Sequence, residues 1–383
     1  MTTKINNEHK KLNVPNLRFP EFQGEWEKCK LGDYGKVVTG NTPPTKDIEN
    51  YENGTYLWAS PADLGTIKLI SETKTMLSAK GFSKTRALPK GSVLVTCIGS
   101  TIGKTGMATK EMSTNQQINS IVVNENSDNE FVYYSIQSAF PRYLSSIAVQ
   151  AVPIISKSAF ELLPNQRPCL QEQKKIGKML SLLDERIATQ NKIIEDLKKL
   201  KCAIAERLFK VTNGEVVALS EVCNIQKGKQ VNGDCLSETG TYYVMNGGTE
   251  PSGYYEQCNA PADTISISEG GNSCGYIQYN REAFWSGGHC YTLTDIQPNV
   301  CNLYLYHYLK SKESAIMKLR IGTGLPNIQK KDLEKFAVLL PPVAKQVRIS
   351  TFLTAIERKT TNEEILLSHF QEEKQYLLRQ MFI

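Results

Sequence analysis

Apolar side chains recur at alternating intervals of three and four residues in two long stretches, 168–211 and 341–383. In the first stretch the series includes Ile176, Leu180 and Leu183, and no proline interrupts it. This heptad spacing predicts a helix of about 40 residues, about 60 Å long at 1.5 Å per residue. A helix of that length needs a partner helix with the same seam, because no compact domain core covers it from end to end.

The second stretch supplies that partner, because it repeats the first at an offset of 173 residues. The helix start QEQKKI at 171–176 matches the run ending in KQVRI at 345–349, and the polar position Lys201 coincides with Lys374. Two unrelated amphipathic helices would not share start, seam and interruption at one offset. We therefore predict an intramolecular antiparallel coiled coil. Its expected seam residues are Ile176, Leu180, Leu183, Ile187, Ile194, Leu197, Ile204, Leu208, Ile349, Leu353, Ile356, Leu367, Phe370, Leu377 and Met381.

Two globular regions, 21–167 and 212–340, share a second pattern of short apolar runs separated by turn residues. In the first region, 92–96 and 118–123 are typical of strands and 129–138 of a short helix. Equivalent residues of the two regions are 188 positions apart near the start of the regions and 172 positions apart later. The first region therefore carries about 16 extra residues between positions 40 and 90, which we expect in surface loops.

The predicted fold class is α+β. Two similar domains, 21–167 and 212–340, alternate with the long helices 168–211 and 341–383, and residues 1–20 form a tail and a strap with no regular structure. Two tandem halves whose helices pair antiparallel predict a molecule with pseudo-two-fold symmetry. The simplest such arrangement places one domain at each end of the helix pair.

Composition narrows the class only slightly. The chain has 383 residues, 40% of them apolar, and a net charge of +6, which is compatible with a polyanionic partner. The sequence has no long apolar run, so we expect neither a membrane span nor a secretion signal. The ten cysteines show no CxxC spacing, so we expect free thiols in a reducing cytoplasm and no metal site.

Catalytic motifs are missing from the sequence. The run GSTIGKT at 99–105 has too few residues between its glycines for a P-loop, so we interpret it as a tight turn or as a loop that approaches a nucleic-acid backbone. His289 and Cys290 are adjacent, and a Cys–His nucleophile pair stays open at this stage. The amides at 115–117 either read adenine edges or satisfy loop carbonyls.

Basic and polar residues in both domains are candidates for contact with DNA, since phosphate contact needs cations and base readout needs amides and hydroxyls. For any single residue the alternative is a solvated surface position. The candidates are Lys84, Arg86, Thr101, Lys104, Thr105, Asn115, Gln116, Gln117, Lys227, Lys229, Ser273, Tyr276 and Arg281.

With the repeat established, the chain resembles the specificity subunit of type I restriction–modification systems. The resemblance covers nearly the whole chain. It depends on the duplicated layout and on VPNLRFP at 14–20, LGD at 31–33, GSTIGK at 99–104, TNQQ at 114–117 and the two matching helix starts. The second domain departs from the GSTIGK and TNQQ patterns.

The resemblance implies that each globular region is a target recognition domain that reads one half of an asymmetric bipartite site in double-stranded DNA. The helix pair would set the unread spacer and dock two methyltransferase subunits, with restriction subunits in the full complex. The chain itself would catalyse nothing and bind no cofactor. S-adenosylmethionine, ATP and Mg²⁺ would belong to the partner subunits, in a bacterial cytoplasm. The alternatives are a self-contained DNA methyltransferase or nuclease, and a coiled-coil adaptor that binds only protein.

Overall fold

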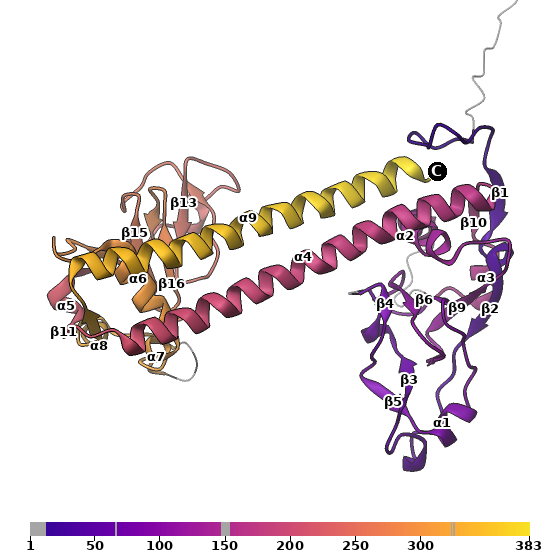
Figure 1. Ribbon diagram of the computed structural model, residues 1–383, viewed down its shortest axis with the longest axis horizontal. Coiled ribbons are helices and arrows are strands. Elements are labelled where there is room, and N and C mark those ends of the chain that lie inside the picture. Colours follow the sequence, from indigo (N-terminus) through magenta and orange to yellow (C-terminus); the bar gives the residue numbers. More distant parts are fainter. Residues whose placement is uncertain (1–12, 66, 147–153, 323, 325) are drawn as a thin grey trace, which may run out of the picture. The chain divides into compact units, whose positions relative to one another are not determined.

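The computed structural model describes residues 13–65, 67–146, 154–322, 324 and 326–383 (Figure 1). The chain divides into two compact units. Unit 1 comprises Met1–Thr189 and Leu367–Ile383, and unit 2 comprises Gln190–Leu366. Each unit thus contains one globular domain and a part of each long helix. The part of the predicted tail that spans residues 1–12 lies outside the described residues.

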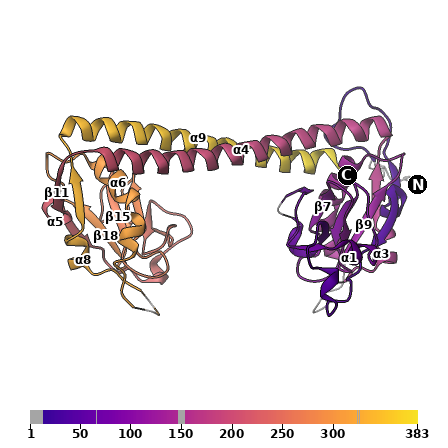
Figure 2. The ribbon, with the colours of Figure 1, turned by 60° about the horizontal axis from the view of Figure 1, so that its bottom comes forward.

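The two predicted long helices are present as α4 (Leu170–Val211) and α9 (Val343–Met381). In unit 1, Lys374 Nζ lies 2.6 Å from Asp184 Oδ1. In unit 2, Lys201 Nζ lies 2.7 Å from Glu357 Oε1. Repeat-equivalent Gln190 and Glu363 also meet in unit 2, and Nε2 of Gln190 donates to the Glu363 carbonyl at 3.0 Å. Positions that rise along α4 pair with positions that fall along α9, which confirms the antiparallel pairing (Figure 2).

Burial along the two helices follows the heptad pattern. All fifteen predicted seam residues are buried or half-buried, and the repeat-equivalent Leu180 and Leu353 are fully buried. Gly177 allows close packing of α4, because a Cβ there would lie 2.5 Å from Asp128 Oδ1 and 2.9 Å from the Phe131 backbone nitrogen. The apolar seam and this close approach anchor α4 in the core of unit 1.

Unit 1 is built on a five-stranded sheet in the order β2-β9-β6-β7-β4, with a three-stranded sheet β5-β3-β8 and a two-stranded clasp β1-β10. Its strands are β1 Glu27–Lys30, β2 Gly35–Thr39, β3 Tyr56–Ala59, β4 Leu69–Ile70, β5 Thr75–Leu77, β6 Val93–Thr96, β7 Thr105–Ala108, β8 Ser113–Thr114, β9 Ile118–Val123 and β10 Pro164–Arg167. Its short helices are α1 Ala79–Ser83, α2 Asn129–Ser146 and α3 Lys157–Glu161.

Unit 2 repeats this plan with a four-stranded sheet β12-β18-β15-β16, a three-stranded sheet β14-β13-β17 and a clasp β11-β19. Its strands are β11 Glu215–Ala218, β12 Asn224–Lys227, β13 Tyr242–Met245, β14 Tyr254–Tyr255, β15 Thr264–Ser268, β16 Ile277–Asn280, β17 Trp285–Ser286, β18 Cys290–Thr294 and β19 Ala337–Leu340. Its short helices are α5 Leu219–Val222, α6 Asn302–Ser311, α7 Glu313–Met317 and α8 Lys330–Glu334.

The two units differ where the sequence offset changes. Unit 1 has the extra strand β4, which pairs in parallel with β7, and the added helix α1. The extra residues therefore form regular structure as well as the loops that we expected. The helix predicted at 129–138 is also longer, because α2 continues through Pro141 to Ser146.

A tyrosine and a carboxylate join each domain to the helix pair in the same way. Tyr134 on α2 donates its hydroxyl to Asp184 Oδ2 at 2.5 Å in unit 1. Tyr306 on α6 donates to Glu357 Oε1 at 3.0 Å in unit 2. Both carboxylates also bind the lysine of the facing long helix, so each junction is a half-buried polar network that fixes the domain against its own helix segments.

Unit 2 adds a buried histidine to this junction. His307 Nε2 lies 2.9 Å from Thr354 Oγ1, and burial together with the nearby Lys201 lowers the pKa of His307 from 6.5 to about 4. The unfolded chain therefore binds the proton more readily, so stability is complete above pH 6.5 and falls as the pH drops toward 4.

We expect the free energy of unfolding of unit 2 to fall by about 2 kcal/mol between pH 7 and pH 5 because of His307. Denaturant titrations at the two pH values measure it. A His307→Gln variant keeps a partner for Thr354 but does not titrate, so its loss over this range should be smaller by the same amount. The pKa of Glu357 is lowered, so its protonation reduces the free energy of unfolding only below about pH 4.5, outside this range. An equal loss in variant and wild type would contradict the assignment.

Candidate functional site

Three loops meet at one end of the main sheet in each unit, because the strands that carry them are neighbours. In unit 1 they are 40–42 after β2, 97–104 between β6 and β7, and 115–117 before β9; together we call them loop set 1. In unit 2 they are 228–230, 269–276 and 287–289, which we call loop set 2.

The backbone of the two loop sets is held by equivalent hydrogen bonds. Gly40 N donates to Ile118 O at 3.1 Å, and Gly228 N donates to Cys290 O at 2.8 Å. The same correspondence holds for Cys97 N to Gln117 O at 2.7 Å and Glu269 N to His289 O at 2.9 Å. One backbone frame is therefore used twice.

A glycine makes the first loop of each set possible. A Cβ on Gly40 would lie 2.2 Å from the carbonyl oxygens of Thr114 and Asn115. A Cβ on Gly228 would lie 2.2 Å from the Gly287 carbonyl oxygen and 2.4 Å from that of Ser286. At both positions the first and third loops approach so closely that only glycine fits without a backbone shift.

Amide side chains dominate loop set 1. Asn115 is buried, and its Nδ2 donates to Gln117 Oε1 at 3.0 Å, so it orders the loop. Gln116 is exposed and accepts a hydrogen bond from Thr42 Oγ1 at 2.5 Å. Asn41 ties a further segment to the set, because its Nδ2 donates to Lys84 O at 2.9 Å and its Oδ1 accepts from Arg86 N at 3.0 Å.

Charged side chains dominate loop set 2. Glu269 is buried at the end of β15, and its Oε1 lies 2.6 Å from Lys227 Nζ and 3.0 Å from the Tyr291 hydroxyl. Its Oε2 makes no hydrogen bond within the described residues and lies 3.8 Å from Nδ1 of the exposed His289. The two units therefore present different chemistry on the same frame.

The structure brings most of the predicted DNA-binding residues to these loop sets but not all of them. Thr105 is buried in β7 and Asn115 beneath its own loop, so neither offers a surface to DNA. Arg281 follows β16 at the opposite end of the sheet from loop set 2. The residues in the loops or beside them are Lys84, Arg86, Thr101, Lys104, Gln116, Gln117, Lys227, Lys229, Ser273 and Tyr276.

Several of these residues, like Gln116 and Lys227 above, are already engaged within the protein. Lys84 forms an ion pair with Asp47 at 3.0 Å. Tyr276 lies under Lys310 Nζ, which is 4.0 Å from its ring centroid. Asn41 and Glu269 were not among the residues predicted from the sequence. Glu269 had one signal, because it occupies the repeat position of the apolar residue Cys97 at the end of a buried strand.

The other motifs considered from the sequence form structural turns or buried positions. Gly99 and Gly103 both have positive φ and belong to a turn between two antiparallel strands, whereas a P-loop joins a strand to a helix. Burial raises the pKa of the Cys290 thiol to about 11, so near neutral pH this sulfur is protonated and a poor nucleophile. Within the described residues, no group of three or more His, Cys, Asp or Glu is placed to hold a metal ion.

No helix in the described part of the chain combines the length and the apolar character that crossing a membrane requires.

Comparison with protein families gives a match in both halves of the chain. The type I restriction modification DNA specificity domain matches residues 23–199 and again residues 212–368. The chain therefore belongs to this family and carries two copies of its domain. As a member it is a DNA specificity subunit, which is the non-catalytic component of a type I system, as the sequence predicted.

Individual relatives agree with this assignment. The chain is 24% identical to the specificity subunit of the type I restriction enzyme MjaIX of Methanocaldococcus jannaschii, over 89% of this chain and 88% of the relative. It is 33% identical to a putative type I specificity subunit of Mycoplasma pneumoniae over 34% of each chain. The crystal structure of a type I S subunit from M. genitalium has the same fold, with a TM-score of 0.69 at 20% identity, covering 97% of this chain and 99% of that one.

Proposed function

We propose that loop set 1 and loop set 2 each read one half of a bipartite, asymmetric site in double-stranded DNA. The observation that carries the proposal is the pair of loop sets, which share their backbone hydrogen bonds and differ in their exposed side chains. A shared frame suits the same docking geometry against the duplex, and different side chains suit different base sequences. An asymmetric site follows from two unlike readers.

Exposed cations next to the loops support contact with the phosphate backbone. Lys104 in loop set 1 and Lys229 in loop set 2 are both exposed, and Arg86 is exposed beside loop set 1. The chain carries a net charge of +6. Such cations supply the sequence-independent part of DNA affinity, which weakens as salt rises.

The helix pair is proposed to set the length of the unread spacer. α4 is an unbroken helix of 42 residues and α9 one of 39 residues. A continuous helix has a fixed rise of about 1.5 Å per residue, so its length translates directly into a distance. The half-buried lysine–carboxylate contacts at each junction resist sliding of the two helices.

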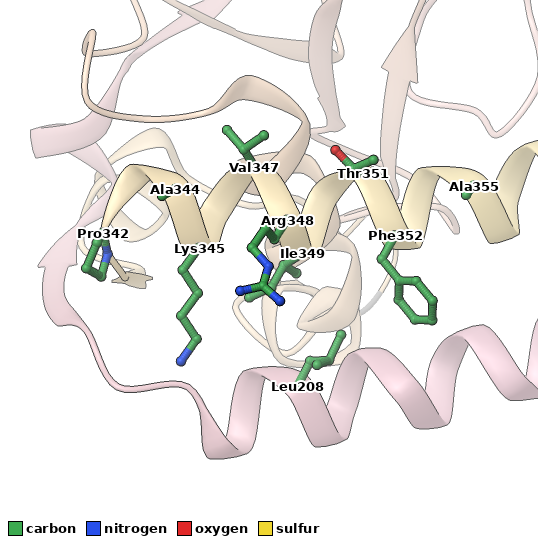
Figure 3. A pocket seen from close by; sticks show the side chains of 10 residues that line it. All are labelled: Leu208, Pro342, Ala344, Lys345, Val347, Arg348, Ile349, Thr351, Phe352 and Ala355. Atoms are coloured by element: carbon green, nitrogen blue, oxygen red, sulfur yellow. The ribbon is translucent and has the colours of Figure 1, made fainter.

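The helix pair is also proposed to dock two methyltransferase subunits. In unit 2 an apolar groove lies where α9 begins, lined by Leu208 of α4 and by Val347, Ile349 and Phe352 of α9 (Figure 3). Val347 and Phe352 are exposed there, which suits an apolar partner surface. The methyltransferase and restriction subunits would bind S-adenosylmethionine, ATP and Mg²⁺. The complex would act in the bacterial cytoplasm, where the DNA lies.

An exchange of one domain tests the proposal. Residues 26–165 are replaced by the corresponding region of another family member, and the chain is co-expressed with its methyltransferase subunits. We expect genome-wide methylation mapping to show a new sequence in one half-site, with the other half-site and the spacer unchanged. A change in both half-sites would contradict independent readers. Methylation by the purified chain alone, without partner subunits, would instead support a self-contained methyltransferase.

A further inference from the structure

Lys227 is the last residue of β12, directly before the close approach of Gly228 to the third loop of unit 2. Its side chain is about half exposed, and its ammonium lies 2.6 Å from Glu269 Oε1. An ammonium has three N–H donors, and the Glu269 contact uses one of them. The other N–H groups have no partner among the contacts found in the described residues, so they remain available to a ligand at the loop surface.

Glu269 holds that ammonium from beneath. It is 9% exposed, its backbone N–H donates to His289 O at 2.9 Å, and its carbonyl accepts from Ile328 N at 2.9 Å. The Tyr291 hydroxyl also binds Oε1, at 3.0 Å. Because the carboxylate is fixed by these contacts, Lys227 is held as a directed donor rather than as a freely moving cation.

The ion pair favours a base edge over a phosphate. A lone lysine attracts phosphates over a long range, but a lysine paired with a carboxylate has no net charge and would bring that carboxylate toward the phosphate. A base acceptor at hydrogen-bond distance carries only a partial negative charge, so the carboxylate repels it far less than it repels a phosphate. Guanine O6 and N7 are the major-groove acceptors that lysine binds most often.

Unit 1 does not have this ion pair. At the positions that correspond to Lys227 and Glu269 it has Thr39 and Cys97, which belong to the same backbone frame. Thr39 donates to Asn119 Oδ1 at 2.6 Å, and burial raises the pKa of Cys97 to about 12. Both positions are therefore uncharged in unit 1. The difference lies at the loop end of the sheet, where two readers of unlike half-sites must differ.

We propose that Lys227, held in place by Glu269, determines one guanine in the half-site read by unit 2, by donating hydrogen bonds to its O6 and N7 in the major groove. The inference rests on the proposed function, and it names a base contact within that site. Glu269 is a positioning residue, because it acts through Lys227.

The test is methylation mapping with the complete complex that carries Lys227→Ala. A base contact of this kind contributes about 5- to 150-fold discrimination. We expect one guanine position in one half-site to lose that discrimination, while the other positions, the spacer and the other half-site are unchanged. Lys335→Ala, which removes an exposed lysine that follows α8, serves as the matched control and should leave the motif intact.

A Glu269→Gln variant gives a second readout that is independent of the motif. Removal of the carboxylate frees the charge of Lys227, so binding to random duplex DNA should strengthen and its salt dependence should steepen by about one phosphate contact, a slope change of about 0.9. The idea is overturned if Lys227→Ala lowers methylation of all sites by one common factor, or has no effect, or if Glu269→Gln leaves the salt slope unchanged. A wild-type complex without any bipartite motif would instead refute the proposed function itself.

Discussion

Removing seven residues from each long helix is expected to abolish methylation at the natural spacer and to move the preference to a spacer shorter by about three base pairs. The segments are 190–196 of α4 and 363–369 of α9, which correspond in the repeat. Seven residues are one heptad, or two helical turns, so the seam continues in register. The helix pair shortens by about 10.5 Å, which is the rise of about three base pairs.

This double deletion also keeps the buried polar contacts balanced. Gln190 and Glu363 hydrogen-bond to each other and leave together, so neither is left buried without a partner. Methylation of duplex libraries that differ only in spacer length gives the measurement. A deletion of 190–196 alone serves as the control, because it leaves the two helices unequal and should prevent assembly. An unchanged spacer preference in the folded double deletion would exclude the helix pair as the spacing element.

A Gly228→Ala substitution is expected to lower methylation of cognate DNA by about 10- to 100-fold. The new Cβ would lie 2.2 Å from the Gly287 carbonyl oxygen, so the first and third loops of unit 2 must move apart. Each pair of hydrogen bonds to a base that this movement breaks removes about 1–3 kcal/mol of discrimination. Binding to cognate DNA and to DNA with a scrambled unit 2 half-site should therefore become similar.

Two further glycine variants make this result interpretable. A Cβ on Gly233 meets nothing within 4 Å, so Gly233→Ala should leave binding unchanged. Gly40→Ala creates the equivalent clash in loop set 1 and should remove discrimination only in the other half-site. If Gly228→Ala and Gly40→Ala affected both half-sites alike, the loops would act through stability and not through readout.

The architecture could be predicted to a large extent from the sequence, because periodicity and repetition are visible along the chain. The seam from Ile176 to Leu208 and its copy after Ile349 required only the spacing of apolar side chains. The candidate site was harder to predict, because the choice of residues followed residue type. Thr105 and Arg281 have suitable chemistry, but Thr105 is buried in a strand and Arg281 lies at the far end of the sheet.

The spacing and repetition of residues are enough to establish that the chain is a doubled unit with two paired helices and two unlike domains of common plan. A heptad or a repeat is a local property that survives without coordinates. Which side chains meet depends on how the strands assemble in the folded chain. Lys227 and Glu269 are 42 residues apart in the sequence. They come together because β12 and β15 both pair with β18, one on each side of it. That strand order depends on long-range packing, and it turns a lysine with no distinguishing sequence motif into a directed donor.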